Sequence, residues 1–134
     1  MLDLKVTNLS AKAEEGYEFE LRIPQSNEGT GAFIKVRGAS SPKVKAYAKK
    51  TFNTMQMKEA QAKRKGRDPE QMTLDEAEDM AIESALVRII DWRGITEGKT
   101  VIEFNEENAR RILREHDWIR TQVLDESDIV ANFI

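Results

Sequence analysis

The sequence predicts an α+β fold that is mainly helical, in which a small N-terminal antiparallel sheet of two or three strands is followed by about four α-helices. The first observation is a change in apolar spacing: apolar residues alternate with polar ones over residues 1–40 and then recur every three or four positions. The second is a helix-capping residue in front of each later apolar run. The length of 134 residues is usual for one domain. We therefore expect a single domain over 1–134, with a β-rich part at 1–40 and a helical part at 41–134.

Two strands are predicted to form a hairpin over residues 17–36. Apolar residues alternate with charged ones over 17–23 and with other residues over 32–36, which is typical of half-buried strands. Pro24 ends the first of these strands, and the loop QSNEGTG turns the chain back. A weaker alternation of leucine and valine predicts a third strand at 2–8.

A long helix is predicted to begin at Ser41 and Pro42, because serine is a favoured N-cap and proline a favoured first helical residue. Apolar residues at helical spacing continue it to about residue 65, roughly 36 Å at 1.5 Å per residue. The run KRKGRDPEQM at 63–72 contains a glycine and a proline, so we expect a mobile linker there.

Thr73 and Glu76 form a capping box that predicts the start of the second helix. Acidic residues fill its first turns, where they interact favourably with the helix dipole. Apolar positions at helical spacing continue through Ile89 and Ile90 toward Trp92. We therefore expect this helix to reach the tryptophan and to be buried at its C-terminal end.

A turn bounded by Gly94 and Gly98 comes next, followed by a short extended segment that ends at Phe104. Trp92 and Phe104 are expected to be buried on either side of this turn. Asn105 is the predicted N-cap of the third helix, which begins with two glutamates.

Asp117 is the predicted N-cap of a fourth helix. The acidic run DESD at 125–128 is expected to interrupt that helix, and the sequence closes with the apolar run IVANFI.

Composition argues against several kinds of site. The chain has no cysteine, which excludes disulfides and thiolate metal ligands, and one histidine, His116. That histidine has no acid–base partner that the sequence identifies, and no pair of acidic residues stands out as a catalytic dyad. We therefore expect no catalytic residue, no metal, no cofactor and no enzyme activity.

The segment from Gly94 to Thr100 resembles the end of a phosphate-binding P-loop, but it is one residue short. A helix is predicted before it and an extended segment after it, which reverses the strand–loop–helix order of that motif. Without a helix N-terminus behind the loop, a phosphate loses its main stabilisation. We expect no nucleotide binding.

The N-terminus lacks the basic and apolar regions of a signal peptide, and no apolar run approaches the ~20 residues that a membrane span needs. We therefore expect a cytoplasmic protein without membrane contact.

The net charge of −3 conceals two opposite blocks. Residues 41–67 carry nine basic residues and one acidic residue, whereas residues 68–83 carry seven acidic residues and no basic one. Opposite patches attract, so we expect either a homo-oligomer or pairing of the two blocks within one chain. The basic helix over 42–67 also allows a small nucleic-acid-binding regulatory protein, although the chain is acidic with a pI near 5.3.

Apolar residues beside these basic residues, and near the C-terminus, are candidate partner contacts. Methionine side chains adapt to varied surfaces, and tryptophan recurs in interface hot spots. Ordinary core packing is the alternative explanation for both. The candidate partner-binding residues are Lys49, Phe52, Met55, Met57, Trp118 and Phe133.

With these elements in place, residues 86–124 resemble part of the tail assembly chaperones of long-tailed, siphovirus-type bacteriophages. In that family a helix ends near a tryptophan and a glycine, and an apolar-x-Phe segment follows. Asn or Ser then opens a helix that contains Glu-Asn-Ala and ends in leucine. Here the order is LVRIIDWRGI, a glycine turn, VIEFNEENARRIL and WIRTQVL. Residues 1–72 share only the general plan. The matching residues are Trp92, Gly94, Phe104, Asn105, Glu107, Asn108, Ala109, Ile112 and Leu113.

The resemblance implies a non-enzymatic, late role in virion morphogenesis. Such chaperones bind and solubilise the tape measure protein in the host cell cytoplasm and are absent from the mature virion. Many also have a longer form, made by a ribosomal frameshift, that helps to recruit major tail protein. This chain has the size of the short, pre-frameshift form.

Overall fold

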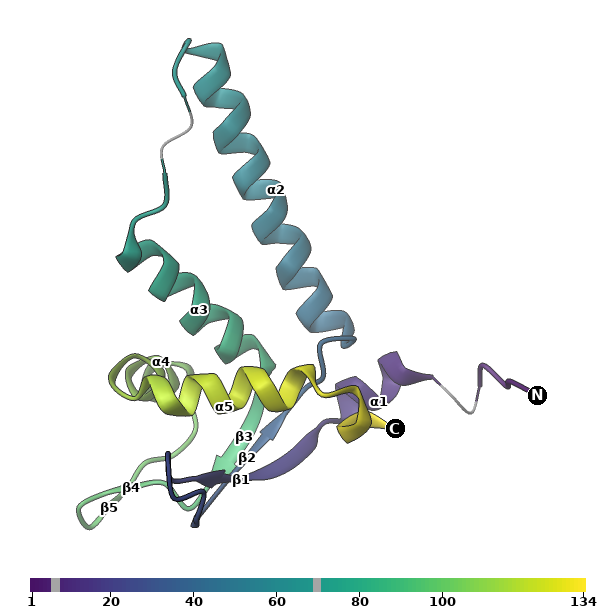
Figure 1. Cartoon of the computed structure of the whole chain (residues 1–134), viewed down its shortest axis with the longest axis vertical. Helices are drawn as coiled ribbons and strands as arrows, with labels where there is room; N and C mark the ends of the chain where they lie inside the picture. The colour runs from purple at the N-terminus through teal and green to yellow at the C-terminus, as the bar shows by residue number, and fades with distance from the viewer. Residues whose placement is uncertain (6–7, 69–70) are drawn as a thin grey trace.

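A three-stranded antiparallel sheet lies below the C-terminal helices, and one long helix extends away from both (Figure 1). This computed structural model describes residues 1–5, 8–68 and 71–134. Its mainly helical α+β architecture confirms the predicted fold class. The elements are α1 (Leu9–Glu15), β1 (Tyr17–Arg22), β2 (Gly29–Val36), α2 (Pro42–Arg64), α3 (Leu74–Arg88), β3 (Ile89–Arg93), β4 (Thr96–Glu97), β5 (Thr100–Val101), α4 (Glu106–Glu115), α5 (Asp117–Asp128) and the short 3-10 helix η1 (Val130–Phe133).

The sheet has the order β1-β2-β3, with antiparallel pairing throughout. Phe19 pairs with Ile34, and Ile34 pairs with Trp92, so one buried row crosses all three strands. The predicted hairpin over 17–36 is confirmed. The third strand comes from Ile89–Arg93, far along the chain from the hairpin.

The predicted strand at 2–8 is wrong for residues 2–5 and Asn8, which are in neither helix nor strand; residues 6–7 lie outside the described residues. Leu2 and Leu4 are 71% and 75% exposed, so their alternation has no apolar face to pack against. The chain instead forms α1 directly after Asn8, whose Oδ1 accepts a hydrogen bond from the N–H of Ala11 at 3.1 Å.

The second helix ends earlier than its apolar spacing predicts. Arg88 is the last residue of α3, and Ile89 has the extended backbone angles φ −82° and ψ 128°. The following residues pair with β2, so sheet hydrogen bonds replace a further helical turn up to Trp92. The switch at Ile89 carries the chain from the helical layer into the sheet.

The long helix and the third helix begin as predicted. The Ser41 side chain accepts a hydrogen bond from the N–H of Lys43 at 3.2 Å, and the Asn105 side chain accepts one from the N–H of Asn108 at 2.7 Å. The fourth helix differs by one residue, because Asp117 is its first residue and His116 is the N-cap without a side-chain cap. It runs unbroken through Asp128, so the DESD run does not interrupt it.

The core lies between the sheet and the C-terminal helices. Helix α5 packs on β1 and β2, and α3 packs against α4 and α5. Trp92 is 7% exposed, its indole N–H donates to the carbonyl of Ile102 at 2.9 Å, and its ring meets that of Phe104 edge-on with 5.1 Å between centroids. The predicted burial around the glycine turn is therefore confirmed, with Phe104 partly exposed.

The predicted linker at 63–72 overlaps the last two residues of α2. Residues 65–68 and 71–72 are in neither helix nor strand, and 69–70 lie outside the described residues. In the part of the chain that the structure describes, no helix is long and apolar enough to cross a membrane.

Candidate partner-binding surface

Helix α2 beyond its base has almost no contact with the body of the protein. Val44 is its one buried residue, and the helix then extends away from the sheet and diverges from α3 (Figure 1). We call residues 45–64 the arm. Helix-favouring alanine, lysine, glutamine and methionine fill it, and Lys63 and Arg64 in its last turn interact favourably with the helix dipole. Local preference therefore maintains this helix where tertiary packing does not.

The arm exposes large apolar side chains. Phe52 is 59% exposed, Met55 49% and Met57 64%. Residues three and four apart share a helix face, so Phe52 and Met55 lie side by side while Met57 points to another side. Because these side chains are about half or more exposed, they contribute little to the stability of the chain on its own, which makes the arm a candidate binding surface.

The arm also carries six of the nine basic residues of 41–67. Among the described residues, none of the nine basic side chains in 41–67 forms an ion pair. The arm therefore presents uncompensated positive charge to solvent.

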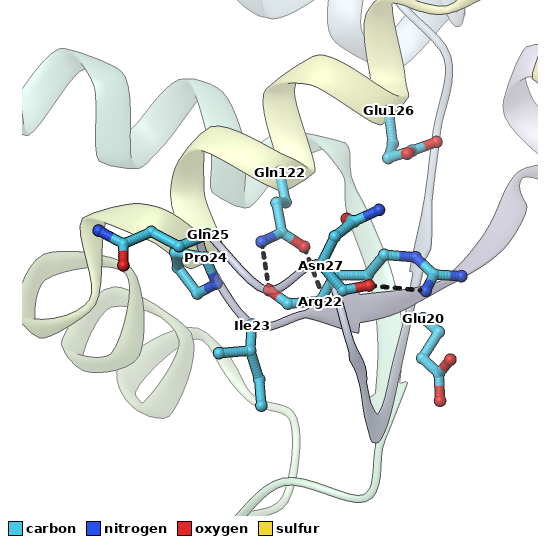
Figure 2. Close-up of a pocket in the computed structure, with 8 residues that line it drawn as sticks. All are labelled: Glu20, Arg22, Ile23, Pro24, Gln25, Asn27, Gln122 and Glu126. Carbon is cyan, nitrogen blue, oxygen red and sulfur yellow. Dashed lines mark hydrogen bonds between the residues drawn. The ribbon is translucent and has the colours of Figure 1, made fainter.

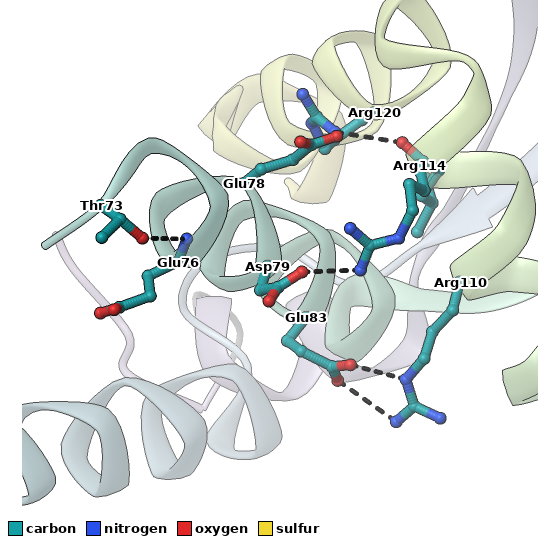
Figure 3. A network of polar contacts seen from close by, with 9 residues as sticks. Thr73, Glu76, Glu78, Asp79, Glu83, Arg110, Arg114 and Arg120 are labelled. Carbon is teal, nitrogen blue, oxygen red and sulfur yellow. Dashed lines mark hydrogen bonds and ion pairs between the residues drawn. The ribbon is translucent and has the colours of Figure 1, made fainter.

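Acidic side chains of residues 68–83, unlike the basic ones of 41–67, form ion pairs within the chain. On α3, Asp79 pairs with Arg114 at 2.6 Å, Glu83 pairs with Arg110 at 2.6 Å, and Glu78 lies 3.8 Å from Arg120 (Figure 3). Arg110 donates a hydrogen bond to Glu83 and Arg114 donates one to Asp79, and each hydrogen bond raises the pKa of its arginine above the usual arginine value. The arginines come from α4 and α5, so these contacts join α3 to the C-terminal helices.

This arrangement contradicts the interpretation in which the two charge blocks pair within one chain. Across the described residues, no ion pair links 41–67 with 68–83. Three acidic side chains of the second block are already bound to arginines, whereas the basic block is available to another molecule.

The structure gathers four of the six candidate residues on one element. Lys49 is exposed on the arm together with Phe52, Met55 and Met57. The other two lie elsewhere: Trp118 on α5 is half-buried against the core, and Phe133 in η1 is 6% exposed.

Phe133 packs edge-on against Tyr17, with ring centroids 6.2 Å apart. Phe133 was expected to offer a partner contact, but it is buried, because the apolar C-terminal run folds back onto the start of the sheet. No local pattern in the sequence indicates this contact, because the strand that Phe133 meets lies more than a hundred residues away.

A polar pocket of about 220 Å³ lies at the end of β1 (Figure 2). There the Gln122 amide accepts from the N–H of Arg22 at 2.9 Å and donates to its carbonyl at 2.7 Å, which satisfies the edge of the strand. Arg22 in turn donates to the carbonyl of Asn27 at 3.2 Å. The polar groups of Arg22, Asn27 and Gln122 therefore form hydrogen bonds with one another. The lining residues are Glu20, Arg22, Ile23, Pro24, Gln25, Asn27, Gln122 and Glu126.

The segment resembling a P-loop forms a small hairpin of β4 and β5. Gly98 and Lys99 make its two-residue turn, in which Gly98 has φ +62°. The next helix begins only at Glu106, so no helix N-terminus backs the loop. Within the described residues, no group of three or more histidine, aspartate or glutamate residues is arranged to hold a metal ion.

One protein family resembles the helical part of the chain. The model of a family described as YdaY prophage protein matches residues 42–134, from the first residue of α2 to Ile134. No curated protein and no solved structure matches the chain.

Proposed function

Because this chain belongs to the YdaY prophage protein family, and is therefore phage-derived, we propose that it is a tail assembly chaperone that binds and solubilises the tape measure protein. The observation that carries the proposal is the arm, where unpaired basic residues surround exposed Phe52 and Met55. A tape measure protein is largely helical and exposes apolar stripes before the tail tube encloses it. A protruding helix with apolar and charged residues is suited to cover such stripes.

The same proposal makes the protein non-enzymatic and active in the host cell cytoplasm, apart from the mature virion. Several copies, acting as a homo-oligomer, would bind a long partner more tightly through avidity. A longer frameshifted form would add the contact with major tail protein. The resemblance of residues 86–124 to tail assembly chaperones supports this assignment.

Co-expression with a candidate tape measure protein is the direct test. We expect a complex on affinity purification and a larger soluble fraction of the tape measure protein. The double variant Phe52→Ser/Met55→Ser should weaken both effects, because it removes apolar contact area from the arm. Val101→Ser/Val130→Ser is the matched control, since these valines are 67% and 57% exposed and lie off the arm. If no complex forms and solubility does not change with the unmodified chain, the proposal is wrong.

The unpaired lysines and arginines favour a second candidate, a small nucleic-acid-binding regulatory protein that uses the basic helix over 42–67. Such binding would weaken steeply with salt, since each neutralised phosphate releases a counterion. A mobility shift of DNA or RNA at micromolar protein, lost at higher salt, would support it. Its absence at low salt would remove this candidate.

A further inference from the structure

We infer that the arm binds an acidic amphipathic helix of another protein, along the stripe that contains Phe52 and Met55. This inference rests on the proposed function, because the acidic helix would be a segment of the tape measure protein. It adds the surface, the chemistry of the partner segment and the charge sign that the partner must carry.

The exposed stripe runs lengthwise along the arm. Ala48, Phe52, Met55, Glu59 and Ala62 follow one another at spacings of four, three, four and three, so they form one line along the helix. Two of these five are large apolar residues with about half of their surface exposed. A line of this spacing is what another helix packs against in coiled-coil-like contacts.

Lysines flank that line on both sides. Lys45 and Lys49 precede Ala48 and Phe52 by three residues and lie along one side, while Lys58 follows Met55 by three and lies along the other. No ion pair engages these three lysines among the described contacts. A partner helix with carboxylates flanking its own apolar stripe would pair with both rows, whereas one with lysines there would be repelled.

A second copy of the chain is not the favoured occupant of this stripe. Two arms laid together would place six basic residues against six. The acidic block of another copy is a poor substitute, because its Glu78, Asp79 and Glu83 are held by arginines of α4 and α5. Breaking those pairs to reach an arm would exchange one set of ion pairs for another. An external acidic partner has no such cost.

Nucleic acid is a less suitable occupant of the stripe than a protein helix. Phosphates would engage the lysines but would leave the stripe of Phe52 and Met55 in water. A single strand could stack one base on the phenylalanine, but methionine offers no flat surface for the next. The apolar stripe therefore favours a protein helix.

Fluorescence anisotropy with designed probes tests the inference. One labelled peptide of about 20 residues, long enough to be helical, carries leucines at coiled-coil spacing flanked by glutamates. A second has the same leucines flanked by lysines, and a third is a single-stranded DNA of similar charge to the first. We expect the glutamate peptide to bind roughly tenfold or more tightly than the lysine peptide, and to weaken as salt rises.

Two double variants locate the site. Lys49→Glu/Lys58→Glu and Phe52→Ser/Met55→Ser should each weaken binding of the glutamate peptide by roughly tenfold. Lys5→Glu/Lys99→Glu changes the net charge equally at exposed positions off the arm, and should have little effect. Circular dichroism of each variant verifies that its helices remain.

Several results would overturn the inference. One is that the glutamate and lysine peptides bind with equal affinity. Another is that the arm variants and the control variant lose the same affinity for the glutamate peptide. A third is that the arm binds DNA but neither peptide. A further result is self-association that depends on the arm, seen by sedimentation, without peptide binding.

The failure of the proposed function can be distinguished from the failure of this inference. If the tape measure protein co-purifies equally well with the wild type and the arm variants, the proposed function holds and the inference about the arm fails. If the arm binds the acidic peptide but no complex with the tape measure protein forms, the arm binds acidic helices and the proposed function fails.

Discussion

Trp92 is the residue that joins the sheet to the segment before α4. Its ring lies in the buried row across the three strands, and its indole N–H reaches the carbonyl of Ile102 on the far side of the glycine turn. Phe104 closes the contact from the same side. One side chain therefore positions the β4–β5 hairpin and the start of α4.

We predict graded losses of stability at Trp92. Trp92→Phe keeps an aromatic ring but leaves the carbonyl of Ile102 without its donor, so it should cost about 1–3 kcal/mol of unfolding free energy. Trp92→Ala removes the ring as well and should cost about 3–5 kcal/mol. Urea denaturation followed by circular dichroism measures both. Equal stability of the alanine variant and the wild type would show that this contact is not formed.

The two glycines of the turn differ in what surrounds them. Both have positive φ, +80° at Gly94 and +62° at Gly98. A Cβ at Gly94 would lie 2.6 Å from the carbonyl oxygen of Gly31, whereas one at Gly98 would meet nothing within 4 Å. Gly94 therefore permits close approach of two backbone segments, and Gly98 serves only the shape of the hairpin.

This contrast predicts different costs for the same substitution. Gly98→Ala should cost about 1 kcal/mol, the strain of an L-residue in the left-handed region. Gly94→Ala adds a backbone clash and should cost more than about 2 kcal/mol. Thermal unfolding of the two variants side by side provides the measurement. Similar melting temperatures for both would argue against the close contact with Gly31.

At the scale of elements, the sequence predicts helices with caps better than strands that pair at long range. Ser41, Thr73 and Asn105 act locally, and the helices that they open appear where expected. Ile89 continues the helical spacing of α3, so local pattern favours a longer helix there, and only pairing with β2 makes it a strand. Helix α1 had a usable signal, since Asn8 precedes the helix-favouring run LSAKAEE.

Glu14 connects α1 with the start of α2. The Ser41 hydroxyl donates a hydrogen bond to its carboxylate, and Arg37 Nε lies 3.2 Å away. The Ser41 hydrogen bond first, and then Arg37, lower the pKa of Glu14 below its ordinary value of 4.5. Since the folded pKa is the depressed one, Glu14 stabilises the fold above the unfolded value, and this contribution is lost as pH falls through the folded pKa.

We therefore predict that wild type exceeds Glu14→Gln in unfolding free energy at neutral pH, and that the difference shrinks as the pH falls below the ordinary glutamate value of 4.5. Urea titrations across that range measure it. Glu15→Gln, an exposed neighbour on α1, is the matched control and should follow wild type at each pH. A gap between wild type and Glu14→Gln that does not change with pH would contradict the assignment.

At the scale of the whole molecule, the sequence shows where the positive charge lies but not whether those side chains are paired within the chain. The nine basic residues of 41–67 are visible in the sequence, as are the seven acidic ones that follow. That α3 turns its acidic side chains to Arg110 and Arg114 depends on how α3 and α4 pack, which no local pattern records. The sequence therefore named four residues that share the arm, Lys49, Phe52, Met55 and Met57, while their exposure could be known only from the fold.

The division into a packed body and an extended arm predicts uneven hydrogen exchange. Opening the arm exposes little buried surface, since α2 buries only Val44, and an isolated helix of about this length is marginally stable. Amides of residues 45–64 should therefore exchange well before those of β2 and α5, measured by mass spectrometry. Adding the tape measure protein or the acidic peptide should slow exchange in 45–64 and leave α5 as the internal control. Protection of the free arm equal to that of β2 would mean that the arm is packed in solution, and would remove the basis for an accessible binding helix.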